Sequence, residues 1–293
     1  MLKPVVSPVR GALSLAFVAL NTIFWCIPLL AVSLLKLLIP LADWRKVCGR
    51  ILVALAQRWV WLNSLGLDFT KSIRWDVQGL DGLSPDAWYI LIANHQTMVD
   101  IVVLQKVFHG KVPMLKFFIK KELMWVPLLG LAWWALDFPF MRRTGSTEQD
   151  MAAARKACEK FRQSPVTVMN FVEGTRFTEK KRRDRHSPYR HLLRPKAGGI
   201  AVVLGCMGRQ VRSILDVTIV YPQGAPKLWT FLCSESMPIT VRVKQHPVSE
   251  PLLENAIEDS EARLRLNGWL NTLWQEKDVE VENLRHNQCP APP

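Results

Sequence analysis

The sequence predicts an α/β domain, with a mixed or parallel sheet flanked by helices, that follows an N-terminal membrane helix or re-entrant hairpin. Short β-branched and aromatic runs alternate with helical segments after residue 67, a pattern typical of one sheet domain. The 293 residues, 49% of them hydrophobic, allow a sizeable core. We therefore expect an anchor and interfacial helix over 1–67, a globular domain over 68–250, and a C-terminal helical segment and tail over 251–293.

The anchor is predicted from residues 11 to 35, GALSLAFVALNTIFWCIPLLAVSLL, which carry no charge. As a helix this run would be about 37 Å long, enough to cross a hydrocarbon core. A secretory signal peptide has a shorter apolar core and a small-residue cleavage site, so we expect an uncleaved anchor. Residues 51 to 67 would lie in the interface or return as the second arm of a re-entrant hairpin, for which Pro28 permits a bend.

The charges beside the apolar run bear on orientation. More basic residues follow the run than precede it, which favours its C-terminal flank in the cytosol. The six cysteines have no CxxC pair and no metal-like spacing, as expected for reduced, cytosol-facing thiols. We expect an inner (cytoplasmic) membrane protein whose globular domain faces the cytosol. The flanking basic residues are Lys3 and Arg10 before the run, and Lys36, Arg45, Lys46 and Arg50 after it.

Beyond the anchor, five runs are typical of strands: IRWDVQG, WYILIA, VTVMNFV, LDVTIVY and ITVRVK. Between them, DMAAARKACEKFRQS begins with an acidic residue and stops before Pro165, as a helix does. The run SEARLRLNGWLNTLWQEKDVEVENLRH has Leu and Trp at helical spacing, and we expect it to pack on the domain although Gly268 weakens it locally.

The stretch ANHQTMVD places a histidine and an aspartate five residues apart, at His95 and Asp100. In a regular helix they would be separated by about 140° around the axis, so they would not share a face. They can meet if His95 lies in the turn before the helix, and WYILIA followed by NHQTMVDIVVLQKVF supplies strand, turn and helix. Asp100 would then bind one imidazole nitrogen and leave the other to take a proton.

A second motif, NFVEGTRF, ends a buried strand in Glu173, Gly174, Thr175 and Arg176. The glycine permits a sharp turn with available backbone amides, and an arginine can bind a phosphate through two hydrogen bonds. The alternative is an ordinary strand-end turn with a surface arginine.

Further basic residues follow apolar segments. They are Arg142 and Arg143, in DFPFMRRTGS, and Lys196, in RPKAGG. Together with the two motifs above, they are what an enclosed anion site would require. His186 and His191 lack flanking cysteine or carboxylate ligands, so we expect a solvated loop there and no metal site.

The order and spacing of these motifs resemble the glycerolipid acyltransferases. NHQTMVD resembles their NHxxxxD signature, FVEGTRF their FPEGTR block, PFMRR their central arginine block and VTIVYPQG their late proline block, over roughly residues 70 to 225. FVEGTRFTEKK and WLNTLWQEKD are most similar to the lysophosphatidate and lysocardiolipin acyltransferase branch. Two positions depart from the family: Val172 stands where many members have proline, and Asp137 where the arginine block often has glycine.

The resemblance implies a glycerolipid acyltransferase-like fold in which His95 is the general base and Asp100 orients it. The acyl group would pass directly from acyl-CoA or acyl carrier protein, as substrate, to a lysophospholipid hydroxyl, without a cofactor and without a covalent acyl-enzyme. The residues that would hold or shape the acceptor pocket are Asn94, Arg143, Glu173, Gly174, Thr175, Arg176 and Lys196.

Charge suggests the partners. Of the formal net charge of +13, residues 180 to 196 carry eight Lys or Arg and one Asp, which favours an anionic membrane surface, an acidic protein such as acyl carrier protein, or nucleic acid. We expect membrane lipids and a lysophospholipid acceptor, and no nucleic acid, although a membrane-tethered nucleic-acid-binding protein, an inactive scaffold and another lysolipid acceptor are alternatives. Residues 123 to 140, rich in Trp and Phe, would border the acyl chain or the lipid interface, or simply pack in the core.

Overall fold

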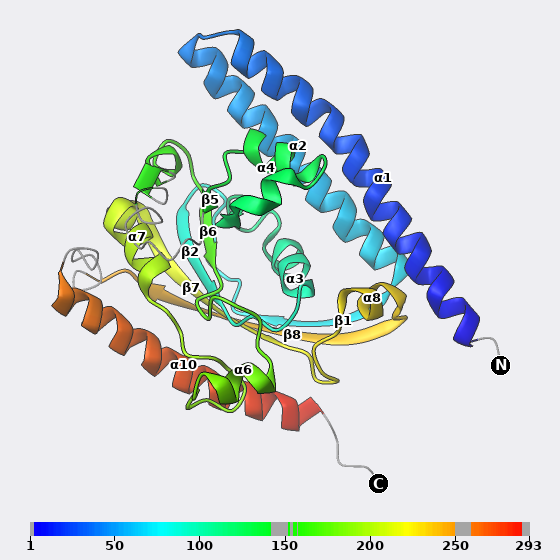
Figure 1. The fold of residues 1–293 in the computed structure, drawn as a ribbon, viewed down its shortest axis with the longest axis vertical. Helices are drawn as coiled ribbons and strands as arrows, with labels where there is room; N and C mark the ends of the chain where they lie inside the picture. The colour runs from blue at the N-terminus through cyan, green and yellow to red at the C-terminus, as the bar shows by residue number, and fades with distance from the viewer. Residues whose placement is uncertain (1–2, 142–151, 153–154, 157, 250–258, 289–293) are drawn as a thin grey trace.

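A six-stranded mixed sheet forms the centre of the protein, in a computed structural model that describes residues 3–141, 152, 155–156, 158–249 and 259–288 (Figure 1). The strand order is β1-β8-β7-β2-β6-β3, and β7 and β8 are antiparallel whereas the other neighbours are parallel. The strands are β1 (Ser72–Gln78), β2 (Trp88–Ala93), β3 (Leu115–Phe117), β6 (Thr167–Asn170), β7 (Val211–Val220) and β8 (Ser236–Pro247). Two short parallel strands, β4 (Ile119–Lys120) and β5 (Phe140–Met141), pair separately.

Helices cover both faces of the sheet, so the central strands are apolar on both sides. One face packs against α3 (Val99–Phe108), the end of α2 (Ala42–Thr70) and α8 (Leu228–Cys233). The other face packs against α7 (Gly198–Met207) and α10 (Ser260–Gln288), as Figure 1 shows. The predicted α/β class and the five predicted strands are confirmed, and so is the C-terminal helix.

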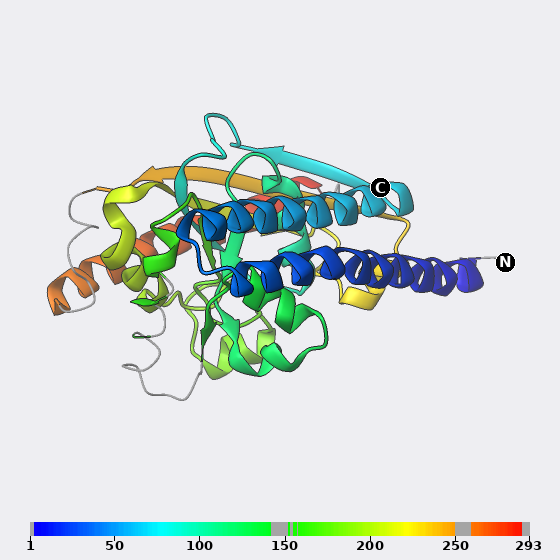
Figure 2. The same cartoon turned by 90° about the horizontal axis from the view of Figure 1, so that it is seen from above.

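The N-terminal segment forms a helical hairpin. α1 (Lys3–Leu38) and α2 run antiparallel and side by side (Figures 1 and 2), and the Asn21 amide donates to Asn63 Oδ1 between them at 2.8 Å. Among the described helices, α1 is long and apolar enough to cross a membrane, over Ser7–Leu38, and only 17% of its most apolar stretch is buried within the chain. The second apolar stretch, residues 51 to 67, lies in α2 and so runs back along α1.

Residues 123 to 140 pack on this hairpin through one face only. The short helix η1 (Lys121–Trp125) leads into α4 (Leu129–Ala135), and apolar side chains from α4 and its flanks are buried against Cys26 and Leu29 of α1. The opposite face is exposed, with Trp125 84% accessible. The segment thus supplies core contacts, one of the three expected roles, and also presents an apolar surface.

Asp137 explains one departure from the family pattern. Its backbone has φ +57°, in the left-handed region that glycine adopts most easily. Unlike glycine, the aspartate has a side chain that forms ion pairs with Lys36 of α1 at 3.1 Å and with Lys160 at 2.6 Å. The structure thus gives the substituted residue a contact between the hairpin and the domain.

Candidate active site

Three loops meet at one edge of the sheet because β2, β6 and β7 are parallel neighbours whose carboxyl ends coincide. The side-chain amide of Asn94, just after β2, donates to the carbonyl of Ile219 at 2.9 Å and accepts from its N–H at 2.8 Å. Gln96 Nε2 also donates to Ile219 at 2.7 Å, and Thr97 donates to the carbonyl of Pro226 at 2.5 Å. The loop after β2 is therefore bound to the end of β7.

His95 and Asp100 are paired in this loop. His95 lies in the turn before α3 and Asp100 in the first turn of the helix, and 2.8 Å separates Nδ1 from Asp100 Oδ2. The same oxygen accepts from the backbone N–H groups of Gln96 at 2.6 Å and Thr97 at 2.9 Å. An ionised carboxylate only accepts, so this pattern assigns the proton to Nδ1 and leaves Nε2 able to take one.

The surroundings of the pair are asymmetric. Asp100 is 0% exposed, whereas 13% of the His95 side chain is accessible. The imidazole stacks on Phe171, with 3.8 Å between the ring centroids and 11° between the planes. One face of His95 is thereby covered while part of the ring still reaches solvent, as required of a base that meets a substrate hydroxyl.

Glu173 supports the same loop from the turn that follows β6. It is 0% exposed, and its two oxygens accept from the backbone N–H of His95 at 3.2 Å and of Leu193 at 2.9 Å. Burial raises the pKa of Glu173 to about 8, although both N–H donors and nearby Lys277 act in the opposite direction. Its carboxyl group thus links the turn after β6 to the loop of His95 and to the segment of Leu193.

The rest of the EGTR turn faces outward. Gly174 has φ +69°, as the sharp turn requires, and Thr175 Oγ1 accepts from Lys181 at 2.8 Å. Arg176 and Lys196 are exposed, and neither cationic end group has a hydrogen bond or ion pair within the described part of the chain. Among the described residues both cations thus remain unpaired beside the EGTR turn, and the side chain of Lys196 packs near Gly174.

Some of the predicted site residues bind the backbone through their polar atoms, whereas others have charged ends that are unpaired among the described residues. Asn94 and Glu173 use their polar atoms on backbone groups, while Arg176 and Lys196 leave theirs open. Arg143, with its neighbour Arg142, lies outside the described residues. Among described residues, no group of three or more His, Cys, Asp or Glu side chains is placed to hold a metal ion.

Two residues of the loop environment were not anticipated. Phe171 lies inside the quoted FVEGTRF motif, and its stacking on His95 could not be read from that motif. Tyr221, inside VTIVYPQG, donates to Asp100 Oδ1 at 2.7 Å. The signal for both was their membership in a motif, but the partner of each lies far away in the sequence.

The basic segment, residues 180 to 196, differs from the solvated loop predicted from the sequence. Its first part forms a short helix, α6 (Glu179–Asp184). Its second part is bound to α10: Asp278 accepts from the backbone N–H groups of Arg190 and His191, and Glu282 binds both side chains. The acidic residues of α10 therefore neutralise part of this charge, which composition alone could not reveal.

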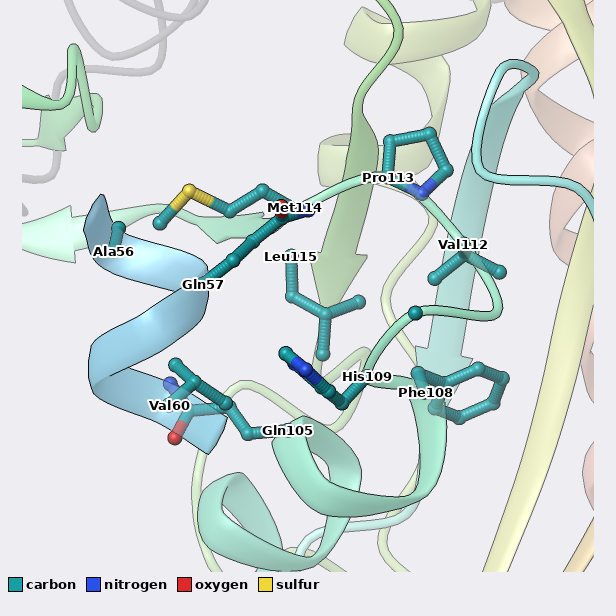
Figure 3. A pocket seen from close by; sticks show the side chains of 11 residues that line it. Ala56, Gln57, Val60, Gln105, Phe108, His109, Val112, Pro113, Met114 and Leu115 are labelled. Carbon is teal, nitrogen blue, oxygen red and sulfur yellow. The ribbon is translucent and has the colours of Figure 1, made fainter. Parts of the chain in front are cut away.

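A cavity of about 40 Å³ lies away from the loop of His95, between α2 and the C-terminal end of α3 (Figure 3). Gln57, Val60, Gln105 and His109 line it. One water occupies about 10–15 Å³, so the cavity has room for a few waters but not for an acyl chain. It stands at the opposite end of α3 from His95 and Asp100.

Comparison with known proteins covers both sequence and fold. The family model described as Acyltransferase matches residues 74–222. Relatives include 1-acyl-sn-glycerol-3-phosphate acyltransferase delta of Mus musculus, 27% identical over 66% of this chain and 52% of its own length. Lysocardiolipin acyltransferase 1 of Danio rerio is 25% identical over 94% of this chain and 71% of its own. The chain thus spans about half the length of the first relative.

A similar fold occurs in the crystal structure of the 1-acyl-sn-glycerophosphate (LPA) acyltransferase PlsC from Thermotoga maritima. The TM-score is 0.61 at 18% identity, over 97% of this chain and 100% of that one. The family match takes in both the histidine loop after β2 and the EGTR turn after β6, and it extends over just over half of the sequence. On that basis this chain belongs to the acyltransferase family.

Proposed function

We propose that this chain is a membrane-bound acyltransferase that moves a fatty acyl group from acyl-CoA or acyl carrier protein to the free hydroxyl of lysophosphatidate, giving phosphatidate. The observation that carries the proposal is the pairing of His95 with the buried Asp100, which orients Nδ1 and leaves Nε2 as a base. The family match and the names of the relatives supply the reaction class.

The reaction requires one proton acceptor and no covalent enzyme intermediate. Nε2 of His95 takes the proton of the acceptor hydroxyl as its oxygen attacks the thioester carbonyl carbon. The carbon–sulfur bond then breaks, and the departing thiolate receives the proton from His95. Asp100 stabilises the imidazolium that exists between these two transfers, and both return to their starting state.

The acceptor is proposed from the free cations beside the loop. A phosphate monoester carries close to two negative charges at neutral pH, and Arg176 can bind it through two parallel hydrogen bonds. Lys196, next to Gly174, adds a second charge, and Arg143 is a further candidate from the sequence motif. A lysolipid with a different head group is the second candidate, favoured by the likeness to a protein named lysocardiolipin acyltransferase.

The membrane location rests on α1. Its apolar length, and the exposure of most of that surface, favour insertion of the hairpin into a bilayer, where the acceptor resides. We place the chain in the inner (cytoplasmic) membrane with the catalytic domain in the cytosol, in line with the basic residues that follow α1. The exposed cations of α6 would attract anionic lipid, or acyl carrier protein as donor.

A direct assay tests this function. Membranes that contain the full chain are incubated with labelled acyl-CoA, or with acyl-loaded carrier protein, and with lysophosphatidate, lysocardiolipin and a lyso-ornithine lipid. We expect labelled phosphatidate as the main product, and its loss in His95→Ala at equal membrane content. Formation of no acylated product from any acceptor would refute the enzyme, and tight nucleic-acid binding at physiological salt would then support the tethered-binding alternative.

A further inference from the structure

The carboxylate of Asp100 has a third kind of partner in addition to His95 and the loop backbone. Oδ2 receives the imidazole and the N–H groups of Gln96 and Thr97, whereas Oδ1 receives only the phenol of Tyr221, at 2.7 Å, among the described residues. Since Asp100 is 0% exposed, bulk water does not reach its carboxylate. The charge on Oδ1 therefore depends on one hydroxyl group.

Tyr221 is fixed by its surroundings. It follows directly after β7 and is 1% exposed, with its ring in the core that also contains α3 and Phe231. The turn after it is closed by the Gly224 N–H, which donates to the Tyr221 carbonyl at 2.9 Å. The oxygen is thus held in place by the packing of the ring as well as by its hydrogen bond, which is how a preorganised supporting residue is built.

We propose that Tyr221 is a positioning residue for acyl transfer, acting on His95 through Asp100. The inference rests on the proposed function, since it assumes that His95 is the base. As the imidazole takes a proton, the adjacent carboxylate must stay charged and oriented, and the phenol stabilises that charged form. Burial and the Asp100 charge raise the pKa of Tyr221 well above its ordinary value, so it keeps the proton that it donates.

Tyr221→Phe removes only the hydroxyl and leaves the ring. We expect kcat to fall on the order of tenfold, with little change in the KM of either substrate, because the lost hydrogen bond supports a charge in the transition state. The pair formed by His95 and Asp100 also becomes easier to protonate, since the carboxylate has lost a donor. The acid limb of the pH profile should move to higher pH by about half a unit or more.

Tyr89→Phe is the matched control. Tyr89 is also 1% exposed and lies in the same core, but its hydroxyl accepts from the backbone N–H of Ser84, away from the catalytic loop. This variant should lose stability comparably and keep the wild-type pH profile. If Tyr221→Phe and Tyr89→Phe have the same kcat and the same acid limb of the pH profile, Tyr221 is only a core residue and the proposal is wrong.

A double variant separates the positioning role from the proposed function. In the Asp100→Asn background, Tyr221→Phe should reduce kcat by much less than it does alone, because its target carboxylate is gone. Reductions that multiply would overturn the proposal. His95→Ala decides the other question: if it retains full turnover, the histidine mechanism itself fails, whereas an inactive His95→Ala beside an unaffected Tyr221→Phe refutes the positioning role alone.

Discussion

Glu173 holds His95 by its backbone rather than by its ring. Oε1 accepts from the His95 N–H at 3.2 Å, while Oε2 accepts from Leu193 at 2.9 Å. A buried acceptor with both oxygens occupied is poorly suited to bind a negatively charged phosphate. We therefore interpret the glutamate of the EGTR turn as the residue that positions the loop of His95, and the neighbouring Arg176 remains the proposed site of anion recognition.

The first prediction concerns the titration of Glu173. Burial raises its pKa from 4.5 to about 8, so the folded protein binds a proton more tightly than the unfolded chain. The resulting stability is fully present below about pH 4.5 and is lost as pH rises through about 8. Between those limits the free energy of unfolding should fall with pH, by at most about 1.4 kcal/mol per unit.

Glu173→Gln should remove that slope, because glutamine does not titrate. It should also lower stability by about 1–3 kcal/mol, since its amide NH₂ must face one of the two N–H donors. Unfolding of the detergent-solubilised protein at several pH values provides the measurement, with the exposed Glu179→Gln as control. The same slope in Glu173→Gln as in wild type would show that another group causes it.

A second prediction compares His95 and Asp100, the proposed catalytic pair. His95→Ala removes the base, and turnover should fall by about 10²–10⁴-fold. Asp100→Asn keeps the shape but presents an amide NH₂ to the donors around it, so the imidazole loses its fixed tautomer. We expect a smaller loss than in His95→Ala, with membrane content unchanged in both. Steady-state rates on washed membranes measure it, and a more active alanine variant would contradict the assigned roles.

The third prediction tests phosphate recognition by Arg176. Its exposed guanidinium should contact the acceptor, so Arg176→Ala should raise the KM for lysophosphatidate by the equivalent of about 1.5–3 kcal/mol and that for acyl-CoA much less. Arg176→Lys should be affected less, because it keeps the charge without the planar fork. Arg212→Ala, an exposed arginine near the start of β7, is the control. An unchanged preference among lysolipids in Arg176→Ala would remove lysophosphatidate as the assigned acceptor.

A fourth prediction concerns the backbone at Asp137. Asp137→Gly and Asp137→Ala both lose the ion pairs with Lys36 and Lys160. Only alanine must also adopt φ +57° with a Cβ atom, which costs about 1–2 kcal/mol. The alanine variant should therefore unfold at the lower temperature in detergent. Equal midpoints for the two variants would be incompatible with a left-handed residue at this position.

Local sequence was sufficient for five of the strands, for the first and last long helices, and for the pairing of His95 with Asp100. WYILIA followed by NHQTMVD predicts a strand, a turn and a helix, and five-residue spacing then requires His95 to lie in the turn, where the structure has it. The uncharged N-terminal run predicts α1 because apolar length is a property of consecutive residues. Helix α7 and the short strands β3, β4 and β5 were not predicted, since they have little periodicity of their own.

Only the tertiary structure decided which residues, distant in the sequence, form hydrogen bonds with one another. Tyr221 lies 121 residues from Asp100, and Glu173 lies 78 residues from His95. The sequence marks each as part of a motif, but a hydrogen-bond partner depends on strand order, and parallel neighbours place their carboxyl ends together only once the sheet has formed. The sequence by itself therefore determined which side chains are available at the loop, whereas folding determined which groups hold His95 and which cations stay unpaired among the described residues.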